Sequence, residues 1–148
     1  MCFDFQAFKL FVLDVELFCA ISGLDLKILL EGARIFEEFK GALTEQYVLQ
    51  QLVASGKIVP FYWTAEKGTA EIDFIFQEGT DIIPLEVKAA ENLRAKSLKS
   101  YCQKYQPKVA VRTSMSNYRE EQWLLNMPLY AINMLLEIIR SKAGLRKR

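Results

Sequence analysis

Two acids and a lysine are spaced along this chain so that they could form a divalent-metal phosphodiesterase site. They belong to two apolar, strand-like segments, Ala70–Phe76 and Ile82–Lys88, which are separated by a short turn. A hairpin of these segments would place Asp73, in the middle of the first strand, beside Glu86 and Lys88 at the end of the second. Two such carboxylates can bind one Mg²⁺ or Mn²⁺ ion, which activates a bound water and neutralises phosphate charge.

The alternation of side chains along a strand gives each of these groups a face and an expected role. Glu71 and Asp73 share one face of the first strand, and Glu86 and Lys88 share one face of the second. We expect the Asp73 and Glu86 carboxylates and the Val87 backbone carbonyl to bind the metal. Lys88 would orient the nucleophilic water or offset charge on the scissile phosphate. The role of Glu71 stays open.

Glu45, on a predicted helix before these strands, could supply a further acid to the metal site. The simpler alternative for the whole set is a solvated ion-pair face, and spacing alone favours that alternative. Against it, Glu86 directly follows a run that is apolar on both faces, where an unpaired acid is costly.

The composition excludes several other chemistries. The 148 residues contain no histidine, which excludes Ser-His and Cys-His catalysis, a histidine base and histidine-ligated zinc. The three cysteines, Cys2, Cys19 and Cys102, show no paired spacing, so we expect reduced thiols in a cytoplasmic protein. The segment Ser55–Ile58 lacks the pattern of a phosphate loop, which argues against a nucleoside triphosphate site in this chain.

Length and charge indicate a single soluble globular domain. Apolar residues make up 51% and charged residues 25% of the chain, and the formal net charge is +1. Basic residues are concentrated between Lys88 and Arg112 and in the tail 140–148. A local basic surface of this kind can bind phosphate. For the tail, a frayed helix end is the simpler interpretation. No apolar run approaches the ~20 residues that a membrane span needs, so no membrane association is expected.

Apolar periodicity and turn residues predict the secondary structure. We expect a strand at 8–13, a helix at 15–21 capped by Asp14, a short helical piece after Asp25, and helical spacing from 35 to 54 that Gly41 could divide. The remaining predicted elements are strands at 58–63, 71–77, 82–87 and 108–112, a turn at 78–81, a helix at 98–105 ended by Pro107, and a helix at 129–141 introduced by Met127-Pro128.

From residue 36 the predicted order is helix, strand, strand, strand, helix, strand. This order, with an acid on the first helix, Asp73 on the second strand and Glu86-x-Lys88 on the third, resembles the PD-(D/E)XK nuclease superfamily, which includes archaeal-type Holliday junction resolvases and restriction endonucleases. The Glu-x-Lys pattern alone is weak evidence, and the order of the elements strengthens it.

A narrower resemblance covers nearly the whole chain. It is to the C-terminal domain of unknown function of a family of prokaryotic AAA-type ATPases, a domain that itself looks nuclease-like. The segments that carry this resemblance are 8–15, 41–48, 62–63, 70–74, 84–88, 96–101 and 128–132.

The resemblance implies an α/β fold with a restriction endonuclease-like core at 36–113. It further implies an N-terminal strand and helical extension at 1–35 and a C-terminal helical extension with a basic tail at 114–148, all in one compact domain. By the resemblance, Asp73, Glu86 and Lys88 match the nuclease motif and Glu45 matches the helix acid.

The expected partners follow from the same resemblance. They are DNA and the ATPase domain that lies upstream in the family, and the sequence leaves the oligomeric state open. Two hypotheses for the function result: a Mg²⁺-dependent, DNA-directed nuclease-like domain, or a non-catalytic binding or regulatory module that keeps the nuclease fold.

Overall fold

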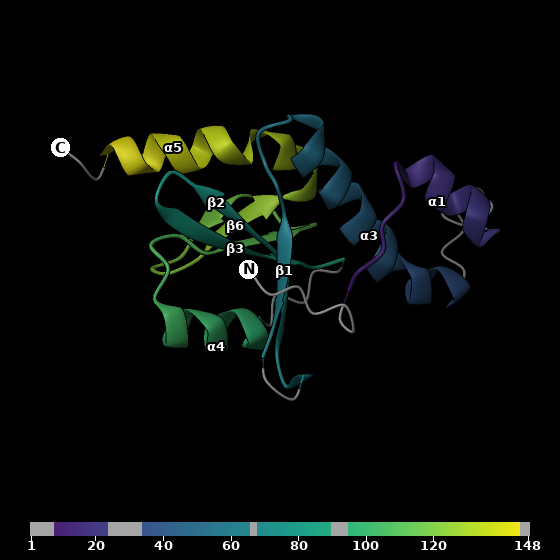
Figure 1. Cartoon of the computed structure of the whole chain (residues 1–148), viewed down its shortest axis with the longest axis horizontal. Helices are drawn as coiled ribbons and strands as arrows, with labels where there is room; N and C mark the ends of the chain where they lie inside the picture. Colours follow the sequence, from purple (N-terminus) through teal and green to yellow (C-terminus); the bar gives the residue numbers. More distant parts are fainter. Residues whose placement is uncertain (1–7, 24–33, 66–67, 90–94, 146–148) are drawn as a thin grey trace.

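A six-stranded mixed sheet forms the centre of the computed structural model, which describes residues 8–23, 34–65, 68–89 and 95–145 (Figure 1). The strand order is β1-β2-β3-β4-β6-β5. The strands are β1 (Phe61–Thr64), β2 (Glu71–Glu78), β3 (Asp81–Val87), β4 (Val111–Ser114), β5 (Arg119–Glu120) and β6 (Leu125–Pro128).

The sheet combines an antiparallel meander with a parallel half. Strands β1, β2 and β3 are antiparallel neighbours, whereas β3, β4 and β6 run parallel to one another and β5 is antiparallel to β6 at the edge. Parallel neighbours need a crossover, and the helix α4 (Lys96–Tyr105) lies between β3 and β4 in the chain. The predicted order of helix, three strands, helix and strand is therefore confirmed for α3 through β4.

Helices cover both faces of the sheet (Figure 1). The long helix α3 (Arg34–Ala54), the 3₁₀ helix η2 (Leu129–Met134) and α5 (Leu135–Leu145) pack on one face, and α4 packs on the other. Helix α1 (Val15–Ser22) contacts α3 and has the predicted Asp14 cap, since Asp14 Oδ1 accepts the Leu17 N–H at 2.8 Å. None of the helices within the described ranges is long and apolar enough to cross a membrane.

The larger core lies between the sheet and the α3–α5 layer. Alternate residues of β2, such as Phe74 and Phe76, face this layer, and they meet Val48 and Leu52 from α3. The smaller core lies under α4, where Leu98 and Tyr101 pack on the sheet; the other buried residues there are Ile72, Ala110 and Leu124. The central strand β3 is buried from Ile83 to Val87, as its continuous apolar sequence predicts.

The hairpin that joins β2 to β3 agrees with its prediction. Glu78 pairs with Asp81, which leaves Gly79 and Thr80 as the turn, and Gly79 adopts φ +61°. Few residues other than glycine accept this angle, so the turn holds the register of the two strands.

One prediction for this part of the chain is wrong, and one open alternative is decided. Residues 8–13 form no strand; instead, the Gln46 side chain bonds both backbone groups of Val12, accepting from N–H at 3.0 Å and donating to the carbonyl at 2.9 Å. Helix α3 runs unbroken through Gly41, because tertiary packing on one face outweighs the ~1 kcal/mol propensity cost of a helical glycine. The predicted helical piece after Asp25 lies outside the described residues.

The C-terminal part contains more sheet than predicted. Strand β4 lies at Val111–Ser114 rather than at 108–112, and the sequence pattern predicts neither β5 nor β6. The predicted helix at 129–141 begins as the 3₁₀ turn η2 and becomes α-helical only at Leu135. The first edge strand also starts later than predicted, after Pro60, whose nitrogen cannot donate to a ladder.

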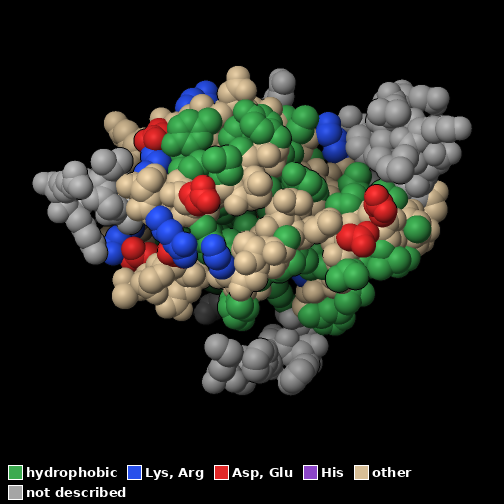
Figure 2. All heavy atoms as spheres, turned by 90° about the horizontal axis from the view of Figure 1, so that it is seen from above, with side chains coloured by type: hydrophobic (Ala, Val, Ile, Leu, Met, Phe, Trp, Pro, Cys, Tyr) green, Lys and Arg blue, Asp and Glu red, His purple; other side chains and the backbone are tan. Residues whose placement is uncertain are grey.

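The surface seen from the α5 side mixes charges of both signs (Figure 2). Basic side chains of α5 pair with acids of the sheet, since Arg140 Nε bonds Glu78 Oε1 at 2.7 Å and Lys142 contacts the Glu120 carboxylate. Exposed apolar side chains gather over α1 and the segment before it, and they include Leu10, Leu13 and Ile21.

Candidate active site

Asp73 lies where strands β2 and β3 part. The paired ladder of these strands ends at Phe74 and Leu85, and the same register continued would set Asp73 opposite Glu86. Here Asp73 Oδ2 accepts the backbone N–H of Val87 at 2.8 Å. In a continued ladder the Val87 N–H would bond a backbone carbonyl, but here it bonds a side-chain oxygen of Asp73. This hydrogen bond fixes the Asp73 carboxylate at the end of β3.

An irregularity on the other side of β2 accompanies this arrangement. Phe61 of β1 pairs with Ile75, but Trp63 pairs with Ile72, so β2 carries one extra residue over this step. Such a bulge re-aims the side chains around it, and bulges often occur beside functional sites. The extra residue falls at Asp73-Phe74, where the carboxylate turns to Val87.

Glu86 is a buried acid with one paired and one unpaired oxygen. Its side chain is 6% exposed, and Oε1 lies 2.6 Å from Lys88 Nζ. Oε2 is buried, and no hydrogen-bond partner for it exists among the described residues. Burial raises the pKa of Glu86, the Lys88 ammonium counteracts this, and the Asp73 charge raises the pKa further. A buried acceptor without a partner costs about 1–3 kcal/mol and points to a functional use.

The charges on Glu45 and Asp73 also act on one another. Burial is the main cause that raises the pKa of the Glu45 carboxyl, and the Asp73 charge is the next. Burial likewise raises the pKa of Asp73, against the opposing effects of the Val87 N–H and of the Lys9 and Lys88 charges. The four side chains proposed from the sequence therefore lie close enough to form one electrostatic cluster.

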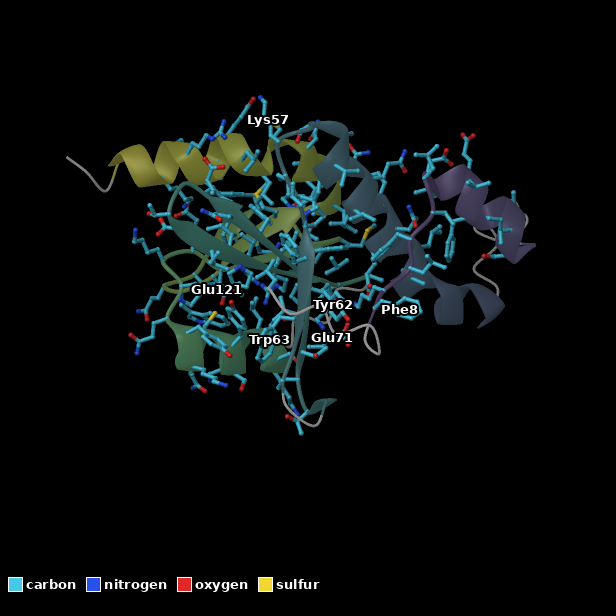
Figure 3. All side chains as sticks on the ribbon, in the orientation of Figure 1. Phe8, Lys57, Tyr62, Trp63, Glu71 and Glu121 are labelled. Carbon is cyan, nitrogen blue, oxygen red and sulfur yellow. The ribbon has the colours of Figure 1, made fainter. Side chains whose placement is uncertain are left out.

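Lys9 is a member of this cluster that the sequence pattern did not predict. Its Nζ lies 3.3 Å from Glu45 Oε2 and 3.5 Å from Asp73 Oδ1, and it also contacts the Glu71 carboxylate. Figure 3 shows Glu71 at the end of the sheet where the N-terminal segment with Phe8 passes. The carboxylate of Glu71, whose role the sequence leaves open, pairs with Lys9.

Arg112 is a second residue whose place sequence reasoning missed. The sequence groups it with the basic surface, but only 3% of it is exposed, and it is the β4 neighbour of Glu86 in the parallel register. Its Nε donates to Asn126 Oδ1 at 2.9 Å, and its Nη2 lies 3.4 Å from Glu121 Oε1. Its charge lowers the pKa of Glu86, although burial outweighs that effect. The only sequence signal for the burial of Arg112 is that it directly follows the apolar run Val109–Val111.

The contacts made by Val87 differ from the predicted role. In the site, Val87 donates its backbone N–H to the Asp73 carboxylate. The role of the Val87 carbonyl as a metal ligand stays a prediction. In the described ranges, no three acidic or cysteine side chains are arranged as a metal-binding group. The available donors are nonetheless hard oxygens, and Glu86 Oε2, which has no partner within the described ranges, is of the type that Mg²⁺ or Mn²⁺ prefers.

Comparison with known families gives one match. A family model described as "Domain of unknown function (DUF4143)" matches residues 40–131, which is 92 of the 148 residues. The matched range contains Glu45, Asp73, Glu86 and Lys88, and Lys9 precedes it. No curated protein and no solved structure matches the chain.

Proposed function

We propose that this chain, which belongs to the DUF4143 family, is a nuclease-like domain that hydrolyses DNA phosphodiester bonds with Mg²⁺ or Mn²⁺. The observation that carries the proposal is Glu86, a buried carboxylate that pairs with Lys88 and lies near Asp73, and whose Oε2 has no hydrogen-bond partner among the residues that the structure describes. Most buried carboxylate oxygens in structural ion pairs have a hydrogen-bond partner, so this oxygen is a candidate ligand atom.

The arrangement of elements supports a restriction endonuclease-like core. Helix α3, the meander β1-β2-β3, the crossover α4 and the parallel β4 follow the order expected of the PD-(D/E)XK superfamily at 36–113. The acids also occupy the expected elements, since Glu45 is on α3, Asp73 on β2 and Glu86 on β3. Strands β6 and β5 extend this core beyond β4, and α5 covers it.

Asp73 and Glu86 would hold the metal, with the Val87 carbonyl as a third oxygen, and Glu45 would assist from α3 rather than complete a three-acid group. When bound, the ion would lower the pKa of a water and neutralise charge on the scissile phosphate. The chain itself provides the positions: the Val87 N–H fixes the Asp73 carboxylate, and the sheet fixes Glu86. Lys88 is held at the site by its backbone N–H, which donates to the Thr113 carbonyl at 2.9 Å. From there its ammonium would orient the attacking water or offset phosphate charge.

A second function is favoured by one observation. The Lys9 ammonium already neutralises part of the acidic cluster, as would be expected of a non-catalytic module that keeps the nuclease fold and binds nucleic acid or a protein. By the resemblance to AAA-type ATPases, the partner would be an ATPase domain, and a cytoplasmic location would follow. Metal-dependent cleavage distinguishes the two functions, because only the first requires it.

The test is cleavage of linear, supercoiled and branched DNA in Mg²⁺ and in Mn²⁺. Asp73→Asn, Glu86→Gln and Lys88→Met should each lower the rate by roughly 100-fold or more, as expected when a group that stabilises transition-state charge is removed. Glu78→Gln is the matched control, because Glu78 lies on β2 at the end remote from the site and pairs with Arg140. Absence of cleavage by the folded wild-type protein on all substrates would refute the enzyme and leave the binding module.

A further inference from the structure

An apolar ridge runs along the outer side of α1. Its residues Leu13, Leu17 and Ile21 recur at a spacing of four and are 83%, 42% and 69% exposed. Cys19, on the opposite side of the helix, is buried, and α1 contacts α3. Figure 1 shows α1 at the far end of the molecule, beyond α3. Helix α1 therefore has two apolar sides, and α3 covers only one of them.

An apolar hollow lies beside this ridge. It has a volume of about 420 Å³ and is bounded by α1, α3, the loop after β4 and the start of η2; its lining includes Val15, Leu43, Tyr47, Met115 and Tyr130. None of the described lining residues is charged. The hydroxyl of Thr44, which also lines the hollow, already donates to the Lys40 carbonyl at 2.7 Å. The hollow therefore suits an apolar side chain better than an ion or a phosphate.

The ridge and the residues that line the hollow form one surface, which we call the α1 surface. Val15, which lines the hollow, lies between Leu13 and Leu17 of the ridge in the chain. Met115 and Tyr130 line the hollow but are 63% and 77% exposed, so they lie at its mouth. A two-fold interface needs a surface that is complementary to itself. The α1 surface meets this need, because the ridge of each copy can enter the hollow of the other.

The exposed apolar area of the α1 surface matches what a stable dimer needs. Five large apolar side chains, three on the ridge and two at the mouth of the hollow, stay partly or largely exposed. Side chains of this size have roughly 150–250 Å² of surface each, so covering them removes on the order of 500 Å² from each copy. A standard interface buries about 800 Å² per partner, of which roughly 60% is apolar, and this apolar share is also about 500 Å².

The charges at the rim of the α1 surface also favour a second copy. Glu16, in the first turn of α1, is exposed and negative. Lys40 precedes Leu43 and Thr44 by three and four residues on α3, so it shares the helix face that lines the hollow. A second copy can thus meet charges of opposite sign at the rim. A DNA strand would instead need several basic contacts beside an uncharged hollow.

We infer that the chain forms a two-fold symmetric dimer in which Leu17 and Ile21 of each copy enter the hollow of the other copy. The dimer covers the outer side of α1, which a single copy leaves exposed. This inference does not depend on the proposed function, because the α1 surface contains none of the candidate catalytic residues.

The experiment measures the mass of the full chain by sedimentation equilibrium over a range of protein concentrations. The wild type should associate to a dimer. Leu17→Lys and Tyr130→Glu should each raise the dissociation constant of the dimer by roughly tenfold or more, because each variant would bury an unpaired charge. Ile21→Lys should have the same effect and provides a second ridge variant if Leu17→Lys folds poorly, since a cation in the last turn of a helix is favourable.

Val59→Lys is the matched control. Val59 lies between α3 and β1, outside the α1 surface, and it is 69% exposed, as Ile21 is. A lysine at this position should leave the dissociation constant of the dimer unchanged.

A mixture of two variants tests the arrangement of the dimer. Leu17→Lys and Tyr130→Glu, mixed in equal amounts, should associate more tightly than either variant alone. In the mixed dimer one ridge-to-hollow contact pairs the new lysine with the new glutamate, and the other contact is wild-type on both sides. A dimer that the single variants weaken and the mixture does not recover would overturn the placement of the ridge in the hollow.

Two results would overturn the dimer on the α1 surface altogether. They are a wild type that stays monomeric at every concentration and a dimer that none of the three variants weakens. The first result would leave the α1 surface to a different protein. The outcome is separate from that of the cleavage assay, since a dimer without cleavage would support this inference and refute the nuclease, and cleavage by a monomer would do the reverse.

Discussion

Val87 donates its backbone N–H to Asp73 Oδ2 at 2.8 Å, across the point where β2 and β3 separate. A backbone donor on a central, buried strand cannot move far, so it fixes one oxygen of the carboxylate before any ligand arrives. The other oxygen is directed to Lys9. Preorganisation of this kind is what a metal-binding acid requires, and it makes a stability prediction that is independent of catalysis.

Asp73→Ala should lower the free energy of unfolding by about 1–2 kcal/mol, because the buried Val87 N–H then loses its acceptor. Asp73→Asn should cost much less, since the amide oxygen can still accept this bond. Urea denaturation of both variants checks the prediction. An equal loss in the two variants would show that the carboxylate charge, and not the hydrogen bond, stabilises this junction.

Glu86→Gln should stabilise the protein at neutral pH. Burial raises the pKa of Glu86 above its ordinary value of 4.5, so the folded chain holds this proton more tightly than the unfolded chain. The stability gained from the neutral acid is fully present below that ordinary value and is lost as the pH rises through the folded pKa. Glutamine stays neutral, so the advantage of the variant should be small at about pH 4 and about 1 kcal/mol at about pH 7.

Denaturation midpoints at both pH values test this expectation. Glu16→Gln, in the exposed first turn of α1, is the control and should show no comparable change between the two conditions. The same difference between Glu86→Gln and wild type at both pH values would contradict the assigned cause. Together with the cleavage assay, a gain in stability with a loss of activity would identify a residue retained for function.

Gln46→Leu should release the N-terminal segment. The variant leaves the Val12 N–H and carbonyl without their partners, so we expect a loss of about 2 kcal/mol and hydrogen exchange at Val12 that is faster by roughly tenfold or more. Gln50→Leu removes a single bond to Val15 and should cost about half as much. Unchanged exchange at Val12 in Gln46→Leu would show that apolar contacts alone hold the segment.

Two glycines should respond to alanine in opposite directions. Gly41 lies inside α3 with open space where the methyl group of an alanine would lie, so Gly41→Ala should stabilise the protein by about 0.5–1 kcal/mol. Gly79 has φ +61° in the β2–β3 turn, so Gly79→Ala should destabilise it by about 1 kcal/mol. Thermal or urea denaturation of the two variants measures both changes, and a destabilising Gly41→Ala would contradict the continuous helix.

The sequence predicted best what local patterns determine. The β2–β3 hairpin depends on a tight turn at Gly79 and on two strongly apolar segments, and its register pairs Phe74 with Leu85, the residues next to Asp73 and Glu86. The prediction of a strand at 8–13 is wrong. The apolar residues of this segment have the composition of a buried strand, but the segment does not pair with the sheet. Its backbone partner is the side chain of Gln46, far along the chain, and no periodicity encodes such a contact.

The missed parts of the site have the same cause. Lys9 joins the acids only because the N-terminal segment docks on α3, and Arg112 is buried only because β6 and Asn126 cover the outer side of β4. Strands β5 and β6 are too short to give a clear alternation, and Asn126 and Pro128 interrupt the apolar pattern of β6. Long-range packing, which a single sequence does not reveal, decided each of these cases.

The most direct test of the central claim is the position of a bound metal ion. Crystals of the protein soaked in Mn²⁺ should give an anomalous difference peak at bonding distance, ~2.1 Å, from carboxylate oxygens of both Asp73 and Glu86. A well-ordered site without a peak, or with a peak that contacts neither carboxylate, would contradict the account.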